Sequence, residues 1–241
     1  MRNYIKTATI GNEEYGLTDK GQIALVDHNL VLEIDHDEKS FDTWISEETI
    51  HQDQKAMLGR RRGPKNGSSI WGKIQYSTIY APGILAVGNG GHGGFILDED
   101  LNEQVHEAWR AKNGQYEEDC CWAVVAYTFP DAFTDKEKRA ATQILMNDYP
   151  HEYMRVTGKT LTIDQSRKLR EEKAAIDNAD KWVVISAIND GEGNVNCLAT
   201  LGGARGQNTK TRKFQVPGDE YKVPVGGFVI DESRHKELEK A

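Results

Sequence analysis

Apolar residues recur with one spacing near the two ends of the chain and with another in its middle, and this order constrains the fold most. Residues 25–34 place Leu25, Leu30, Leu32 and Ile34 among polar neighbours, and residues 181–217 contain the short segments KWVVISAI, NVNCLATLGG and TRKFQVP, both of which predict strands. Residues 101–180 instead repeat apolar residues at intervals of three and four, which is typical of amphipathic helices. Strands, then helices, then strands predict the α+β class, with a mostly antiparallel sheet and a central group of three to four helices.

The ends of the predicted helices carry recognisable signals. Thr134 and Glu137 have the spacing of a capping box, and Thr162 and Gln165 repeat it. In the N-terminal piece, Ser46 is expected to cap a further short helix. The chain is expected to finish with a strand and a short charged helix. The helices are predicted over residues 46–58, 101–112, 117–129, 134–149 and 164–180.

A stretch rich in glycine, proline and serine interrupts both patterns at residues 59–69. It divides the chain into a β-rich N-terminal piece with a short helix (1–58), a basic flexible loop (59–69) and an α+β domain (70–241). The loop holds the dense basic cluster Arg60, Arg61 and Arg62, with Lys65 close by. Such a cluster either contacts phosphate or nucleic acid or is simply a solvated loop, and we favour the second interpretation.

The composition narrows the class of protein. The 241 residues carry a formal net charge of −8, so the overall field does not attract nucleic acid, and only the basic loops suit direct binding. No apolar run approaches the roughly 20 residues of a membrane helix, and the N-terminus lacks a signal peptide, so we expect a cytoplasmic protein. Three cysteines without a CxxC pair predict no structural zinc site, and we expect no cofactor.

The segment GNGGHGGFILDED, residues 88–100, surrounds His92 with glycines. It matches neither a dinucleotide-binding loop nor a P-loop, because no helix follows the glycines and no Gly-Lys-Ser/Thr stands in register. Glycine lets a backbone approach a ligand closely, so the turn could present N–H groups and the His92 imidazole to an anion or a carbonyl. Alternatively, it is a hairpin turn that needs positive φ at several glycines.

A second candidate is QYEEDCCW, residues 115–122. Its carboxylates could act as general acid or base, and a thiol at a helix N-terminus is activated as a nucleophile, although neighbouring acids oppose a thiolate. The alternative, without a catalytic role, is a helix cap with an exposed acidic face. We predict no metal site. The candidate catalytic residues are His92, Glu117, Glu118, Asp119 and Cys120.

A third candidate is LGGARGQNTKTRKF, residues 201–214, a glycine-rich turn with several cations. Arg205, Lys210 and Arg212 could hold a phosphate or an acidic partner. Ordinary surface charge on a β-hairpin loop explains them equally well.

Residues 70–236 resemble an uncharacterised domain family of phage proteins and of plasmid and integrative-element proteins. Its members show a His-Gly-Gly turn followed by a Tyr-Glu-Glu-Asp-Cys-x-Trp-Ala block, and KWVVISAI, NCLATLGGARG, KFQVPGDEY and GGFVIDESRH are similar to its C-terminal strands. Gly-Asn-Gly-Gly stands here where the family shows Thr-Pro-Ser before the histidine. The matching positions are His92, Gly93, Gly94, Tyr116, Glu117, Glu118, Asp119, Cys120 and Trp122.

The resemblance implies a mobile-element setting and no particular activity. We therefore expect an accessory protein that binds a host protein or nucleoprotein complex, such as an anti-defence inhibitor. The alternative is a hydrolase or transferase that uses His92 with the Glu117–Cys120 cluster. Closeness of these two stretches beside a shared cleft favours the enzyme.

Overall fold

The computed structural model describes residues 2–206 and 208–238, which form two compact units, Met1–Leu145 and Met146–Ala241. The predicted α+β class is confirmed. Every strand pair within the described ranges is antiparallel, but the strands form several separate sheets. No helix in this described part of the chain has the length and apolar character needed to cross a bilayer.

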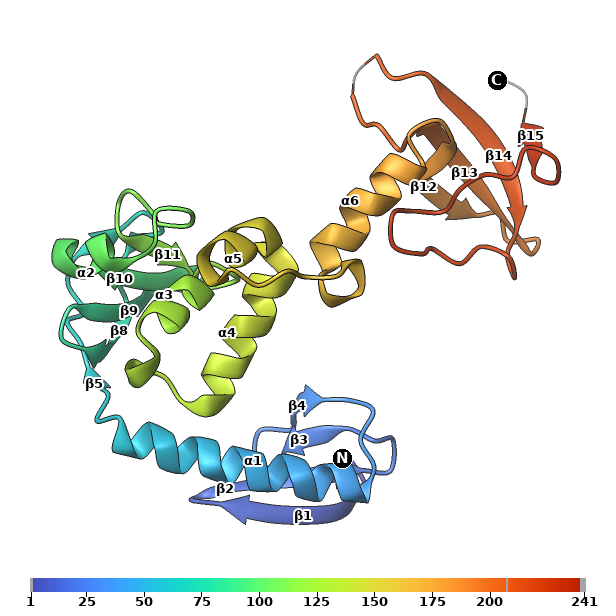
Figure 1. The fold of residues 1–241 in the computed structure, drawn as a ribbon. Coiled ribbons are helices and arrows are strands. Elements are labelled where there is room, and N and C mark those ends of the chain that lie inside the picture. Colours follow the sequence, from blue (N-terminus) through green and yellow to red (C-terminus); the bar gives the residue numbers. More distant parts are fainter. Residues whose placement is uncertain (1, 207, 239–241) are drawn as a thin grey trace. The chain divides into compact units, whose positions relative to one another are not determined.

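The first sheet and one helix form the N-terminal part of unit 1. Residues 25–34, where the pattern predicts a hairpin or two short strands, include the end of β3 and the whole of β4, which pair antiparallel. Figure 1 shows α1 lying against the sheet, where its buried Phe41 packs with Tyr15, Leu17 and Ile23. The elements are β1 (Tyr4–Ile10), β2 (Glu13–Thr18), β3 (Ile23–Leu25), β4 (Leu30–Glu33) and α1 (Glu38–Met57).

The helix predicted over residues 46–58 begins eight residues earlier, at Glu38. Its cap is Asp37 and not Ser46, because the Asp37 carboxylate accepts the Ser40 N–H at 2.7 Å while the Ser40 hydroxyl accepts the Asp37 N–H at 2.9 Å.

A five-stranded sheet forms the middle of unit 1, in the order β11-β10-β9-β8-β5 (Figure 1). A two-residue hairpin, β6 with β7, stands apart from it. The strands are β5 (Arg61–Arg62), β6 (Ser68–Ser69), β7 (Gly72–Lys73), β8 (Tyr76–Ala81), β9 (Ile84–Gly88), β10 (Gly93–Leu97) and β11 (Gln115–Glu117).

Residues 63–74, here called the crossing segment, lie across one face of this sheet. At the β8 side the Ser77 hydroxyl donates to the Pro64 carbonyl at 2.6 Å. At the β11 side the Ile70 N–H donates to the Gln115 side-chain oxygen at 2.9 Å. The basic stretch expected as a free loop is therefore tied to the sheet at both ends.

Two helices of the middle region are shorter than predicted. The helix expected over 101–112 is α2 (Glu99–Gln104), which ends because Val105 is extended. The helix expected over 117–129 is α3 (Trp122–Thr128), because Gln115–Glu117 pair with β10 as a strand instead. A 3₁₀ turn, η1 (Pro130–Ala132), follows α3.

In the next helices, capping signals predict one helix start correctly and another incorrectly. The predicted helix 134–149 is confirmed as α4 (Asp135–Asp148), with the Thr134 N–H donating to Glu137 at 2.8 Å. The helix α5 (Pro150–Thr157) was missed, because its proline stands in the first turn, where the absent N–H costs nothing. The Thr162–Gln165 box caps a 3₁₀ turn, η2 (Ile163–Gln165), while Ser166 caps α6 (Arg167–Asp177).

Unit 2 contains a four-stranded sheet around a core that includes Cys197, Phe214 and Val216. The sequence NDGEGN, residues 189–194, is a strong hairpin signal, and the two strands that flank it pair antiparallel as that signal predicts. The charged helix expected near the C-terminus is wrong for the described residues, because residues 236–238 pair with β14 as a strand. The strands are β12 (Trp182–Asn189), β13 (Asn194–Leu201), β14 (Thr211–Pro217) and β15 (Lys236–Leu238).

Candidate functional site

Pairing of β10 with β11 brings the His-Gly-Gly turn and the Tyr-Glu-Glu-Asp-Cys block side by side. Gly94 stands opposite Glu117, and the Glu118 N–H donates to the Gly93 carbonyl at 3.1 Å. Stretches more than twenty residues apart in the sequence thus share one end of the sheet, next to His92.

The turn between β9 and β10 is organised by Asn89. Its side-chain oxygen accepts the N–H groups of Gly91 and His92, each at 2.9 Å, and its own N–H donates to the His92 carbonyl at 2.9 Å. Its amide also donates to the Trp71 carbonyl at 2.6 Å, which joins the turn to the crossing segment. The His92 side chain is exposed. Sequence reasoning overlooked Asn89, although an asparagine before two glycines is a turn signal.

Glycine is needed in this turn because neighbouring groups approach the backbone closely, and not because the backbone is left-handed. β9 and β10 form the hairpin that the alternative interpretation expected, but no glycine from Gly88 to Gly94 has positive φ, so the expected positive φ is wrong. A Cβ on Gly94 would lie 2.6 Å from the Trp71 ring, and one on Gly93 would lie 2.7 Å from a Glu118 carboxylate oxygen. A Cβ on Gly88 would overlap the Tyr76 ring. Tyr76 is a further member of the site. The glycine that faces it, Gly88, was the signal in the sequence that could have pointed to it.

The acidic block spans a strand end and a turn. The Glu117 carboxylate accepts the Asp119 N–H at 2.8 Å, while the side chains of Glu118 and Asp119 are exposed. Cys120 is half-buried in the turn before α3, so the block does not lie inside a helix as predicted. Trp122 is half-buried as the first residue of α3.

Tyr116 faces the interior. Its hydroxyl donates to the Asn102 side-chain oxygen at 2.6 Å and accepts the Ala111 N–H at 3.2 Å. Burial raises the pKa of this phenol. Tyr116 therefore holds β11 against the segment that follows α2, and its hydroxyl faces no open surface.

The site presents an imidazole and two carboxylates to solvent without linking them. Within the described ranges, the His92 side chain has no hydrogen bond or ion pair. A pocket of about 500 Å³ in the same unit is lined by Leu58, Tyr80 and Phe129 among others, and neither His92 nor the acidic block contributes to it. This pocket is therefore separate from His92 and the acidic block.

Arg60, predicted as a possible phosphate contact, is instead an internal residue. Its guanidinium donates to both Glu137 oxygens, at 2.8 and 2.5 Å, and lies 3.7 Å from the centre of the Tyr80 ring. The side chain is only 8% exposed. Burial would raise the pKa of Glu137, but hydrogen bonds from Arg60 and Thr134 outweigh burial and lower it. Arg61 and Arg62 remain exposed on β5.

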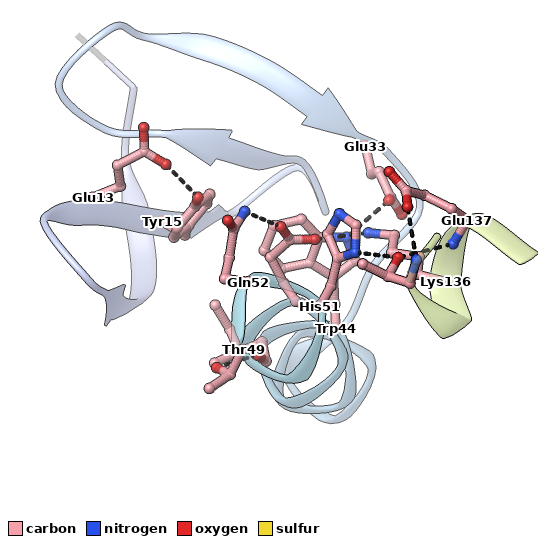
Figure 2. Close-up of polar contacts among 12 residues, drawn as sticks. Glu13, Tyr15, Glu33, Trp44, Thr49, His51, Gln52, Lys136 and Glu137 are labelled. Atoms are coloured by element: carbon pink, nitrogen blue, oxygen red, sulfur yellow. Dashed lines mark hydrogen bonds and ion pairs between the residues drawn. The ribbon is translucent and has the colours of Figure 1, made fainter. Parts of the chain in front are cut away.

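A polar network that sequence reasoning missed joins α1 to the start of α4 (Figure 2). The His51 ring nitrogen Nδ1 and the Thr134 hydroxyl are 2.8 Å apart, and Lys136 forms an ion pair with Glu48 at 2.8 Å. Burial lowers the pKa of His51. Because Thr134 is buried, this network holds two helices together and offers no exposed nucleophile.

The basic candidate residues of unit 2 also include both internally paired and exposed side chains. Arg212 lies 4.8 Å from the ring centres of both Trp182 and Phe214 and is paired with Glu232 and Glu237, so it is a structural residue. The Arg205 guanidinium donates to the Ile185 carbonyl at 3.0 Å. Lys210 is exposed.

Comparison with known proteins finds one family model that part of the chain matches. Residues 64–179 match the model of a domain of unknown function, DUF7007. The predicted resemblance to an uncharacterised domain family is confirmed in this form, and the matched range includes both the His-Gly-Gly turn and the acidic block. Residues 181–236, expected to belong to the family, lie outside the match. No curated protein and no solved structure matches the chain.

Proposed function

We propose that this protein is an accessory protein of a phage or mobile element that binds a host protein or nucleoprotein complex, as an anti-defence inhibitor does. One observation carries the proposal. Unit 1 holds 23 Asp and Glu against 15 Lys and Arg, whereas residues 146–241 hold 15 of each. The whole net charge of −8 therefore belongs to unit 1.

The partner that fits a concentrated negative charge is a basic protein surface, such as a groove that otherwise holds nucleic acid. Exposed carboxylates that bond to no other side chain among the described residues are available for it. Together with the candidate site they form the acidic surface of this proposal. Its members are Asp100, Glu103, Glu107, Glu118 and Asp119.

Capture from host lysate, followed by competition, tests the proposal. The protein should retain a nucleic-acid-binding host protein, and added duplex DNA should release that protein because both occupy one groove. A variant with Glu103→Gln, Glu107→Gln, Glu118→Gln and Asp119→Asn should lose the partner. The matched control neutralises four exposed acids of unit 2, Asp164, Asp180, Glu192 and Asp219, and should keep it. Equal loss in both variants would contradict the proposed surface.

The enzyme alternative rests on the contact between Glu118 and Gly93, which sets acids beside His92. A hydrolase or transferase would use His92 with Glu117–Cys120. His92→Ala separates the two functions. Loss of the biological effect with the partner retained would favour chemistry, and an unchanged effect would favour binding.

A further inference from the structure

The pocket of about 500 Å³ in unit 1 lies where β5 leaves the edge of β8. β5 pairs with β8 through only two residues, Arg61 and Arg62. Before Arg61 the chain turns away at Gly59, whose φ is 60°. Tyr80 and Ala81 of β8 therefore have no strand partner on the β5 side within residues 2–206 and 208–238. Gly59, Tyr80 and Ala81 all line the pocket, so an open strand edge forms one of its walls.

An open strand edge offers backbone hydrogen bonds to a ligand. Unpaired N–H and C=O groups on an edge strand are a template for another extended chain, and several domains bind peptides by adding a strand in this way. Tyr80 is also the extra residue of a β-bulge, because the register of β8 against β9 shifts between Ile79 and Ala81. In the described part of the chain, Tyr80 therefore has no strand partner on either side of β8.

Apolar side chains form most of the other walls. Ile79 and Ile84 contribute from the sheet, Leu101 from α2, Phe129 from the end of α3 and Leu58 from the end of α1. The volume falls within the range of roughly 300–1,000 Å³ that is usual for ligand sites. Alternate side chains of an extended chain point to the same side, so two apolar side chains two residues apart can enter the pocket together.

Two side chains of opposite charge also line the pocket. Arg61 and Asp131 are both exposed, and among the described residues neither forms an ion pair, either with the other or with a third residue. A ligand that carries one positive and one negative group can pair with both of them. A peptide with free ends carries an ammonium group and a carboxylate, and its backbone also suits the open edge of β8.

We propose that this pocket binds a short apolar peptide whose two ends are free. The peptide lies along Tyr80 and Ala81 as an added strand, and its apolar side chains fill the space between the sheet, α2 and the end of α3. The Arg61 guanidinium donates to the peptide carboxylate, and the Asp131 carboxylate accepts from the ammonium group. None of the acidic-surface residues lines this pocket, so peptide binding and host-protein binding are separable properties.

Isothermal titration calorimetry with the tripeptide Leu-Ala-Leu tests the proposal. Acetylation of its amino group and amidation of its carboxylate should each weaken binding about fivefold, the upper range for an exposed ion pair. Successive backbone N–H groups of an extended chain point to opposite edges. Methylation of one of the two peptide nitrogens should therefore weaken binding about fivefold, by removing a hydrogen bond to β8, while methylation of the other should leave it unchanged.

Two variants assign each end of the peptide to its partner. Arg61→Gln should bind the free peptide and its amide equally, and Asp131→Asn should bind the free peptide and its acetylated form equally. Each variant should keep the other discrimination. The matched controls, Arg62→Gln and Asp53→Asn, replace exposed charged residues of unit 1 outside the pocket and should bind like the wild type. Circular dichroism identifies any variant that fails to fold.

Three results would overturn the proposal. The first is absence of wild-type binding at millimolar peptide. The second is equal affinity for the free peptide and for a peptide blocked at both ends, because apolar contact alone would then explain binding. The third is an equal effect of methylation at both peptide nitrogens, which would exclude an added strand. None of these results bears on capture of a host protein by the acidic surface.

Discussion

Two glycine-rich hairpin turns of similar sequence, Gly88–Gly94 in unit 1 and Asn189–Asn194 in unit 2, are built on opposite principles. Each is closed by a side chain that accepts two backbone N–H groups, Asn89 in the first and Asp190 in the second. In the first turn the glycines have ordinary φ, and Gly88, Gly93 and Gly94 have crowded surroundings. In the second, Gly191 and Gly193 have φ of 81° and 94° with open space around them.

The difference shows that glycine content alone does not reveal what a turn does. The NDGEGN glycines make a chain reversal possible, and a Cβ on Gly191 or Gly193 would meet nothing within 4 Å. The GNGGHGG glycines admit Tyr76, Trp71 and Glu118 and so shape a surface around His92. Substitutions separate the two principles, because an added Cβ meets a neighbour in one turn and only backbone strain in the other.

The largest effect is expected at Gly94. An alanine Cβ there would meet the Tyr116 carbonyl, which cannot yield without breaking the β10–β11 pairing, and would lie 2.6 Å from the Trp71 ring. Gly94→Ala should lower the free energy of unfolding by about 3 kcal/mol or more, in the upper range of overpacking. Urea unfolding measures it. A loss below about 1 kcal/mol would show that the crowding is not a real constraint.

The second effect concerns backbone conformation. Gly191→Ala places a Cβ in open space but in a left-handed conformation, and should cost about 1 kcal/mol. Gly191→Asn should cost less, because asparagine tolerates this conformation better than alanine. The pair is measured by the same urea unfolding. Equal costs for alanine and asparagine would contradict φ as the cause.

The sequence predicts helix starts and hairpin turns correctly where the signal is local. Thr134 and Glu137 predicted the start of α4, and NDGEGN predicted the β12–β13 hairpin, because in both cases the responsible residues lie within six positions. It misjudged the segments whose structure depends on distant partners. Gln115–Glu117 looked like the start of a helix, but β10 pairs with it as a strand.

The candidate site shows the same distinction between local signals and contacts with distant residues. The sequence selected His92 and the acidic block but could not show that strand pairing joins them. Nor could it separate Arg60 from Arg61 and Arg62, since only the position of Glu137, 77 residues away, makes Arg60 internal. Adjacent arginines of identical chemistry thus have different roles because of what folds against them.

A third effect distinguishes the two turns by pH. Backbone hydrogen bonds from Glu192 and Asn194 lower the pKa of Asp190 below its ordinary value of 3.8. A lowered carboxyl pKa contributes stability above the unfolded-state pKa, and that stability is lost as pH falls through the folded-state pKa. The Asn89 turn has no such group at its centre.

Amide chemical shifts between pH 6 and pH 2 measure this contrast. The Glu192 and Asn194 amide signals should shift at the acid end, while the Gly91 amide, held by Asn89, should not follow them. Asp190→Asn keeps an acceptor oxygen and should remove the dependence. A transition that persists in Asp190→Asn would assign the pH effect to another group.

The smallest predicted effect is at Gly90, and the sign of its change in the free energy of unfolding tests the comparison between the two turns. Gly90 lacks positive φ, and a Cβ there would stay 3.9 Å from the nearest neighbour, the Gln75 side-chain oxygen. Gly90→Ala should therefore raise the free energy of unfolding by about 0.5 kcal/mol, because alanine restricts the unfolded chain and strains nothing in the folded one. Gly191→Ala, equally free of contacts, should lower it. Opposite signs at two uncrowded glycines isolate backbone conformation as the property that the turns do not share. A loss at Gly90 would mean that this turn also depends on glycine's conformational freedom.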